Sequence, residues 1–258
     1  MTTDDIRAIR DVPSLQGKVS PEEWRARVEL AACYRLAHRD GWNNGIYNHC
    51  TVRSPDDPNR FLIKAHVLMW DEITASNLIS VNMHEELDER SKVNRPGFVL
   101  HSAVLRARPD VNAVVHVHPD SCIAVSASRD GLLPTCQQAL RFYGRMAYHD
   151  YEGITENADE RDRIVANLGD KPAMLMRNHG ATTLGPTIAD AYVMMGNLIA
   201  ACDIQLRVQA AGVEIMLPSP ELCEATVAQI KAHEAGRGQD DWPGRMRELD
   251  RHDAGYRD

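Results

Sequence analysis

The sequence lacks the features of nucleic-acid-binding and membrane proteins. Its formal net charge is −8 at pH 7, and no stripe of lysine and arginine runs along it. This argues against nucleic acid and an anionic membrane surface as main partners. No apolar run approaches the length of a membrane span. The first residues, Met1-Thr-Thr-Asp-Asp, lack the basic and apolar regions of a signal peptide. We therefore expect a cytoplasmic protein.

Cysteine is also sparse. The six cysteines are scattered and form no Cys-x-x-Cys pair. This predicts small buried thiols in a reducing compartment rather than disulfides or a zinc knuckle. The chain has 258 residues, of which 43% are hydrophobic and 26% charged. It is long enough for one large α/β domain with a substantial core.

The chain divides into three parts. Residues 1–19 are polar and aperiodic, which predicts a flexible N-terminal arm. Ser20-Pro21-Glu22-Glu23 is a capping box that begins the first helix of a main domain over residues 20–217. Residues 218–258 contain a helix from about 220 to 235 and a polar tail with spaced aromatic residues. We expect this part to pack on the domain or on a neighbouring subunit.

Short apolar runs between turns predict the sheet. Runs at 45–53, 61–64 and 78–81 predict three strands that could pair as antiparallel neighbours. A helix is expected over about 98–107, and further strands over 146–151, 173–176 and 181–184. A long helix over 188–211 follows a capping motif at Thr187.

One strand, Val111–Pro119, carries His116 and His118. Because alternate side chains of a strand share a face, the two imidazoles lie together. Such a pair at a strand end is suited to hold one metal ion. Taken alone, it is also consistent with two exposed histidines on an edge strand. His179 lies where another predicted strand breaks at Gly180, a turn that can project a side chain into a cleft.

These motifs resemble the class II aldolase/adducin family. The similarity covers Glu22 to Leu217 and rests on the helix at 97–109, on Val114-Val-His116-Val-His118-Pro and on Arg177-Asn-His179-Gly-Ala. It implies an α/β fold, a three-layer α/β/α sandwich around a mainly antiparallel sheet, and a homo-oligomer, often a tetramer. It also implies that His116, His118 and His179 hold a divalent metal, usually zinc, with manganese, iron and cobalt as other candidates. Three imidazoles leave coordination positions open for substrate.

The sequence departs from the sugar-phosphate aldolases of that family. Gly97 stands where their acid/base glutamate is expected, and Gln138 where a proton-donating tyrosine is expected. Their phosphate-binding loops are replaced by Asn48-His49-Cys50-Thr51 and Lys64-Ala65-His66-Val67. Glycine and short hydroxyl residues, which let backbone amides approach a phosphate, are largely missing. A phosphorylated sugar is thus disfavoured.

We therefore expect a metal-dependent carbon–carbon lyase, of decarboxylase or aldolase type, that acts on a small non-phosphorylated hydroxy or oxo acid through a metal-stabilised enolate. An aromatic-derived acid is one candidate, since the resemblance includes decarboxylases of hydroxylated aromatic acids. Decarboxylation gains weight because, unlike aldol cleavage, it needs no base to deprotonate a hydroxyl.

The adducin-like branch of the family is matched by the stretch from Tyr148 to Gly153. Tyr148, His149 and Glu152 are the candidate catalytic residues, although an aromatic strand followed by a turn is also typical of simple packing. Candidate substrate-binding residues are Gln138, Arg95 and Arg141. His49 and His66 could contact a carboxylate or be surface histidines.

Two other function classes stay open. Three histidines can hold Fe(II), so a mononuclear non-haem iron oxygenase with decarboxylating activity is one alternative. The other is a non-catalytic binding protein like the adducin head domains. Adducin heads are expected to lack the full histidine triad, and this chain retains it, which favours an enzyme.

Overall fold

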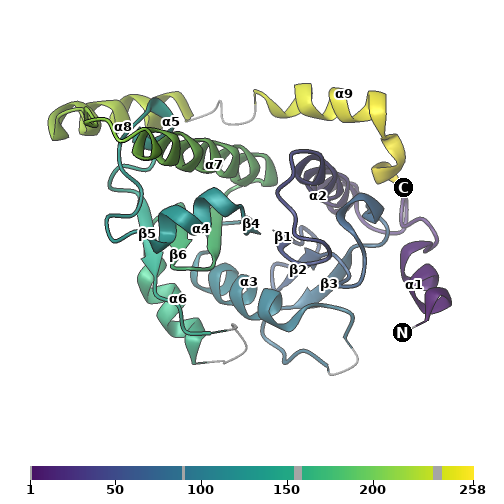
Figure 1. Cartoon of the computed structure of the whole chain (residues 1–258). Coiled ribbons are helices and arrows are strands. Elements are labelled where there is room, and N and C mark those ends of the chain that lie inside the picture. The colour runs from purple at the N-terminus through teal and green to yellow at the C-terminus, as the bar shows by residue number, and fades with distance from the viewer. Residues whose placement is uncertain (1, 89–90, 154–158, 235–239) are drawn as a thin grey trace.

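The computed structural model describes residues 2–88, 91–153, 159–234 and 240–258. Its described strands form a seven-stranded sheet in the order β3-β2-β1-β4-β7-β6-β5 (Figure 1). Neighbouring strands are antiparallel except β5 and β6, which are parallel. The strands are β1 (His49–Arg53), β2 (Arg60–Ile63), β3 (Ile79–Asn82), β4 (Ala113–Val117), β5 (Met146–His149), β6 (Ala173–Met176) and β7 (Gly180–Gly185).

Helices cover both faces of this sheet. Helices α2, α4 and α7 pack on one face, and α3 and α6 on the other (Figure 1). The predicted α/β sandwich with a mainly antiparallel sheet is thereby confirmed, as is the antiparallel pairing of β1, β2 and β3. The helices are α1 (Thr3–Arg10), α2 (Pro21–Arg39), α3 (Arg95–Ala107), α4 (Asp120–Ala127), α5 (Gln137–Leu140), α6 (Glu160–Leu168), α7 (Ile188–Ala210), α8 (Pro220–Glu234) and α9 (Trp242–His252), with short 3-10 turns at Trp70–Glu72 and Ala254–Arg257.

Strand β4 lies at the centre of the sheet, so its two faces meet different layers. Val115 and Val117 belong to the apolar core beneath α2, α4 and α7. Val114 belongs to the core under α3 and α6. Since His116 is two residues from Val114, its ring lies on the α3 side. The alternation predicted from the sequence is observed, and β4 is a central strand rather than an edge strand.

Local sequence signals fix the helix that faces these histidines. The Oδ1 of Asn94 accepts a hydrogen bond of 3.0 Å from the backbone N–H of Gly97 and so caps α3. Proline at the start of the helix suits the first turn, where no intrahelical N–H is needed. Helix α3 therefore begins at Arg95, three residues earlier than expected.

Both chain ends are more ordered than the sequence suggests. The N-terminal segment, expected to be a flexible arm, contains α1, which Thr2 and Asp5 cap reciprocally. Ile9 of this helix is buried. At the other end Tyr256 is fully buried, and its backbone oxygen accepts from the N–H of Ala75 at 2.9 Å. The C-terminal tail thus packs on its own domain, against α2 (Figure 1).

The structure also bears on the cysteines and on the membrane-span prediction. All six cysteines are free, and five of them are buried. Among the described helices, none is both long enough and apolar enough to cross a membrane.

Candidate metal centre

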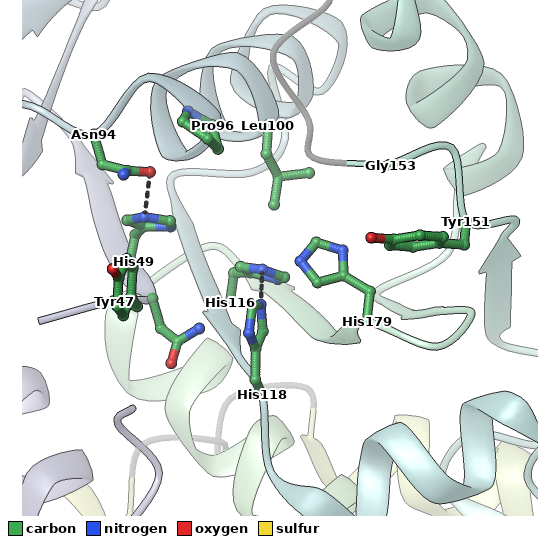
Figure 2. Close-up of a pocket in the computed structure, with 11 residues that line it drawn as sticks. Tyr47, His49, Asn94, Pro96, Leu100, His116, His118, Tyr151, Gly153 and His179 are labelled. Atoms are coloured by element: carbon green, nitrogen blue, oxygen red, sulfur yellow. Dashed lines mark hydrogen bonds between the residues drawn. The ribbon is translucent and has the colours of Figure 1, made fainter. Parts of the chain in front are cut away.

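Three histidines, two from the end of β4 and one from the turn before β7, meet at one point. His116 lies near the end of β4, His118 just beyond it, and His179 in the turn between β6 and β7 (Figure 2). One ring nitrogen from each lies within 4.8 Å of the others. The Nε2 atoms of His116 and His118 are 2.9 Å apart. Within the described residues this is the group of histidine, cysteine and acidic side chains whose spacing suits a metal ion.

The turn before β7 brings His179 to the other two. Strand β7 pairs with β4, and Ala181 lies opposite Val117, so the start of β7 faces the end of β4. A Cβ at Gly180 would lie 2.6 Å from the His118 ring and 2.7 Å from the backbone oxygen of Val117. Only glycine allows this close approach. Asn178 adopts a positive φ of 57°, which asparagine tolerates better than most residues.

Hydrogen bonds prepare His116 to act as a ligand. Its Nδ1–H donates to the backbone oxygen of Ala181 at 3.1 Å, and the Oγ1 of Thr182 lies 3.0 Å away. The neutral ring carries one proton, and that proton is on Nδ1, so Nε2 has a free lone pair. This lone pair faces the other histidines. This is the arrangement that fixes the tautomer and orientation of metal-ligating histidines.

The three imidazoles are neutral at physiological pH. Burial, reinforced by the neighbouring histidines, holds the pKa of His116 well below its ordinary value. Burial and then His179 lower the pKa of His118 to about 4. Burial also lowers the pKa of His179. Metal ligands must be deprotonated, so the residues present fit a divalent metal.

The triad opens on a cavity of about 420 Å³. Apolar and aromatic groups and a few neutral polar groups share its wall with the three histidines. The other lining residues are Tyr47, Asn48, His49, Asn94, Pro96, Leu100, Tyr151 and Gly153 (Figure 2). None of these described lining residues is lysine, arginine, aspartate or glutamate. Such a cavity suits a small ligand that reaches open metal positions.

His49 occupies the space beside Gly97, the position at which the family resemblance implies a glutamate in the aldolases. A Cβ at Gly97 would lie 2.6–2.8 Å from three atoms of the His49 ring. The Nε2 of His49 lies 3.0 Å from Oδ1 of Asn94. The side chain is 7% exposed, so it is not the surface histidine that the sequence allowed. Burial and nearby His101 and Lys64 hold the pKa of His49 well below its ordinary value.

The three candidate catalytic residues make contacts outside the cavity wall. The Tyr148 hydroxyl accepts from the N–H of Leu132 at 2.9 Å, and the guanidinium of Arg177 lies over its ring. His149 is buried, and its Nδ1 lies 2.8 Å from the side-chain nitrogen of Asn167.

Glu152 forms an ion pair with Arg163. That pair lowers the pKa of the Glu152 carboxyl. None of the three candidates is among the described residues that line the cavity.

The candidate substrate-binding residues also lie elsewhere. Arg95 is exposed at the first position of α3. Gln138 is half-buried on the short helix α5. Arg141 lines a separate hollow together with residues such as Gln137 and Met216. The described wall of the metal cavity includes none of these three side chains.

Tyr151 is the main cavity residue that the sequence analysis missed. It lies in the stretch from Tyr148 to Gly153 that was singled out, but strand β5 ends at His149. Tyr151 therefore follows the strand, and its hydroxyl points toward His179 (Figure 2). Because β5 ends at His149, the alternation of side chains along a strand does not give the direction of the Tyr151 side chain. Nothing in the sequence marks this earlier end of the strand.

Comparisons with known proteins agree with this architecture. Residues 28–206 match the model of the class II aldolase and adducin N-terminal domain. A Caulobacter vibrioides protein whose name assigns it to aldolase class 2 is 42% identical over 248 residues. The match covers 95% of this chain and 96% of the Caulobacter protein. Rat alpha-adducin is 43% identical over 190 residues, 72% of this chain but 26% of alpha-adducin. The crystal structure of an aldolase II superfamily protein from Pseudomonas syringae superposes with a TM-score of 0.88 at 42% identity, covering 95% of this chain and all of the other.

Proposed function

From the membership of this chain in the class II aldolase/adducin family, we propose that it is a metal-dependent carbon–carbon lyase for a small, non-phosphorylated hydroxy or oxo acid. The convergence of three neutral histidines on a cavity carries this proposal. His116, His118 and His179 would hold a divalent metal, with zinc as the first candidate. When bound, such a metal supplies a Lewis acid that withdraws electrons from a substrate carbonyl or carboxylate.

The wall of the cavity argues against a phosphorylated substrate. Its described residues include no cation to pair with a phosphate. Lys64, which lies in one of the altered loops, is 2% exposed. Its Nζ donates to the backbone oxygens of Ala65, His66 and Leu68 at 3.0–3.3 Å. This lysine holds its own loop together and has no proton left for a ligand.

The described wall also has no carboxylate base. Aldol cleavage must remove a proton from a substrate hydroxyl, whereas decarboxylation needs a proton only after the bond has broken. We therefore favour decarboxylation. In a 3-oxo acid the bond to the carboxyl carbon breaks, carbon dioxide leaves, and the electron pair moves onto the neighbouring oxo group, which gives an enolate.

Tyr151 is our candidate for the proton donor. Its hydroxyl points into the cavity beside His179 (Figure 2). The O–H would transfer its proton to the carbanionic carbon, which completes the product. The side chain is 57% exposed, so solvent can return the proton afterwards. The other candidates, Tyr148, His149 and Glu152, are not among the described residues that line the cavity.

The test is metal-dependent release of carbon dioxide. Chelator-treated protein, reloaded separately with Zn²⁺, Mn²⁺ or Co²⁺, is incubated with a panel of hydroxy and oxo acids, with and without an aromatic group. We expect release with at least one acid, and only from metal-loaded protein. Equal release from the chelated protein would contradict the proposal.

Two observations keep second candidates in view. The similarity to alpha-adducin supports a binding protein without catalysis, and the protein would then bind no metal. Three histidines also suit Fe(II), and an iron oxygenase would consume oxygen. Metal analysis after anaerobic purification, with an oxygen-uptake assay, separates both from the lyase.

Family resemblance further supports a homo-oligomer, and light scattering would distinguish a tetramer from one 28.8 kDa chain.

A further inference from the structure

We propose that Tyr47 determines substrate specificity by packing against an uncharged, mainly apolar group of the acid. This inference rests on the proposed function, because that group belongs to the same acid whose other end meets the metal. It identifies the substrate class more narrowly: a hydroxy or oxo acid that carries an apolar side group, rather than a bare three-carbon acid.

The cavity is larger than a three-carbon acid needs. At about 30 Å³ of liquid per water molecule, its volume of about 420 Å³ has room for roughly fourteen waters. An acid such as lactate fills the space of only a few. Cavities that bind ligands bury most of the surface of the ligand. We therefore expect a further group on the acid to fill the rest of the space.

The wall of the cavity favours an apolar group in that space. None of its described lining residues is lysine, arginine, aspartate or glutamate. Pro96 and Leu100 of α3 supply apolar side chains, and Tyr47 and Tyr151 supply two aromatic rings. A second charged group on the acid would lose its water there without gaining a partner of opposite charge. An apolar group pays no such penalty and is stabilised by leaving water.

Tyr47 presents apolar surface that a ligand can reach. It is 56% exposed, whereas Leu100 in the same wall is 2% exposed. Tyr47 and Tyr151 are the two exposed large hydrophobic residues of the described chain that line this cavity. An apolar group that covers the Tyr47 ring removes both surfaces from water at once.

The exposure of Tyr47 does not come from a loose backbone. Its N–H donates to the backbone oxygen of Asn44 at 2.9 Å, and its own oxygen accepts from Nε1 of Trp70 at 3.0 Å. Trp70 is fully buried and packs edge-on against Tyr34, with ring centroids 4.8 Å apart. The Tyr47 ring is centred 5.7 Å from that of His66. Tyr47 is therefore held in position before a ligand arrives, which lowers the entropy cost of binding.

The two tyrosines lie on opposite sides of the triad (Figure 2). Tyr151, the proposed proton donor, lies on the side of His179. Tyr47 lies on the other side, next to His49 (Figure 2). The ring of His49 is centred 6.1 Å from that of His116. An acid held at the triad with its reacting carbon toward Tyr151 therefore extends its remaining group toward Tyr47.

The experiment compares acids that share one metal-binding end. Lactate, 3-phenyllactate and 2-hydroxy-4-phenylbutyrate each carry a carboxylate and a 2-hydroxyl, and the last two add a phenyl ring at two different distances. None has a 3-oxo group, so binding is measured without turnover. Dissociation constants for the full Co²⁺-loaded chain come from the visible absorption of bound Co²⁺. We expect at least one phenyl acid to bind about tenfold more tightly than lactate, or better, because its ring leaves water.

Three variants locate this preference. Tyr47→Ala removes the ring and should bring both phenyl acids within about threefold of lactate. Tyr47→Phe keeps the ring without its hydroxyl and should keep the preference. Leu222→Ala is the matched control, because Leu222 is also 56% exposed but is not part of the described cavity wall. It should keep the preference as well. Since both positions are more than half exposed, these substitutions leave the core intact.

The outcomes separate this inference from the proposed function. Stoichiometric Co²⁺ without a preference for either phenyl acid overturns the inference alone, and indicates that a second copy of the chain or another molecule covers Tyr47. A preference that survives Tyr47→Ala, or one that Tyr47→Phe abolishes, overturns it too. Failure of wild-type protein to bind Co²⁺ overturns the proposed function and the inference with it.

Discussion

The imidazole of His49 occupies the space that a side chain at Gly97 would need. A Cβ at Gly97 would lie only 2.6 Å from Cδ2 of the His49 ring. The two positions are thus coupled: glycine at 97 and histidine at 49 fit together, and a carboxylate at 97 could not be added without moving His49. If position 97 is that of the aldolase base, as the family resemblance implies, a base there would require His49 to lie elsewhere.

Tyr151→Phe tests the proton donor. Removing the hydroxyl should lower kcat by about 10²-fold or more and leave KM nearly unchanged, because the proton is needed only in the chemical step. Steady-state kinetics on a responsive acid measures both. Tyr148→Phe is the matched control, three residues away and outside the described cavity wall.

That control should have a different effect. The Tyr148 hydroxyl accepts from the N–H of Leu132, so its loss should lower the free energy of unfolding by about 1 kcal/mol. If Tyr148→Phe abolished kcat and Tyr151→Phe did not, the assignment of the donor would be reversed.

Gly180→Ala tests the approach of the strands that assembles the triad. The new methyl would press on the His118 ring and on the backbone oxygen of Val117. The backbone cannot give way as easily as a flexible side chain, so the histidines should separate. We expect Zn²⁺ affinity to fall by about tenfold or more, measured by competition with a chromogenic chelator.

Gly212→Ala is a useful comparison for that experiment. Gly212 has a positive φ of 65°, so alanine would be strained there, but its Cβ would meet no atom within 4 Å. It should lower stability without changing Zn²⁺ affinity. Equal affinity in Gly180→Ala and wild-type protein would show that the turn does not position His179.

His101 predicts how the stability of metal-free protein depends on pH. It is fully buried, and burial lowers its pKa to about 3. In the unfolded chain its pKa is about 6.5. Between these values the unfolded state binds a proton that the folded state does not, so stability falls as pH falls below about 6.5.

The size of this effect can be isolated by mutation. From pH 7 to pH 5 wild-type protein should lose about 2 kcal/mol more stability than His101→Leu. Urea denaturation in the presence of a chelator measures both proteins at each pH. Parallel losses in the two proteins would show that His101 titrates alike in the folded and unfolded states.

The sequence predicted the sheet and the shared face of His116 and His118 for physical reasons, and the family resemblance added His179 to that pair. The period of two along β4 placed His116 and His118 on one face, and Gly180 marked the turn that projects His179. The remaining cavity wall was not predictable in the same way. Asn94, His49 and Tyr151 come from different elements, and their meeting depends on how α3 lies across the sheet.

The ends of elements produced the other differences. A strand is expected over residues 146–151, whereas β5 ends at His149 and Tyr151 lies beyond it in the cavity wall. Residues 1–19 are polar and aperiodic, which predicts a flexible arm, whereas Thr3–Arg10 form α1. Its reciprocal cap between Thr2 and Asp5 is a weak signal in sequence, and the burial of Ile9 depends on tertiary contacts.

The central claim is that His116, His118 and His179 hold one divalent metal ion. Its most direct test is the metal content of purified protein, reloaded with Zn²⁺, freed of excess metal and measured by mass spectrometry. Wild-type protein should retain about one ion per chain, and a folded variant with both His116→Ala and His118→Ala should retain less than about a tenth of that. Equal retention by the two proteins, or no retention by wild-type protein, would contradict the account.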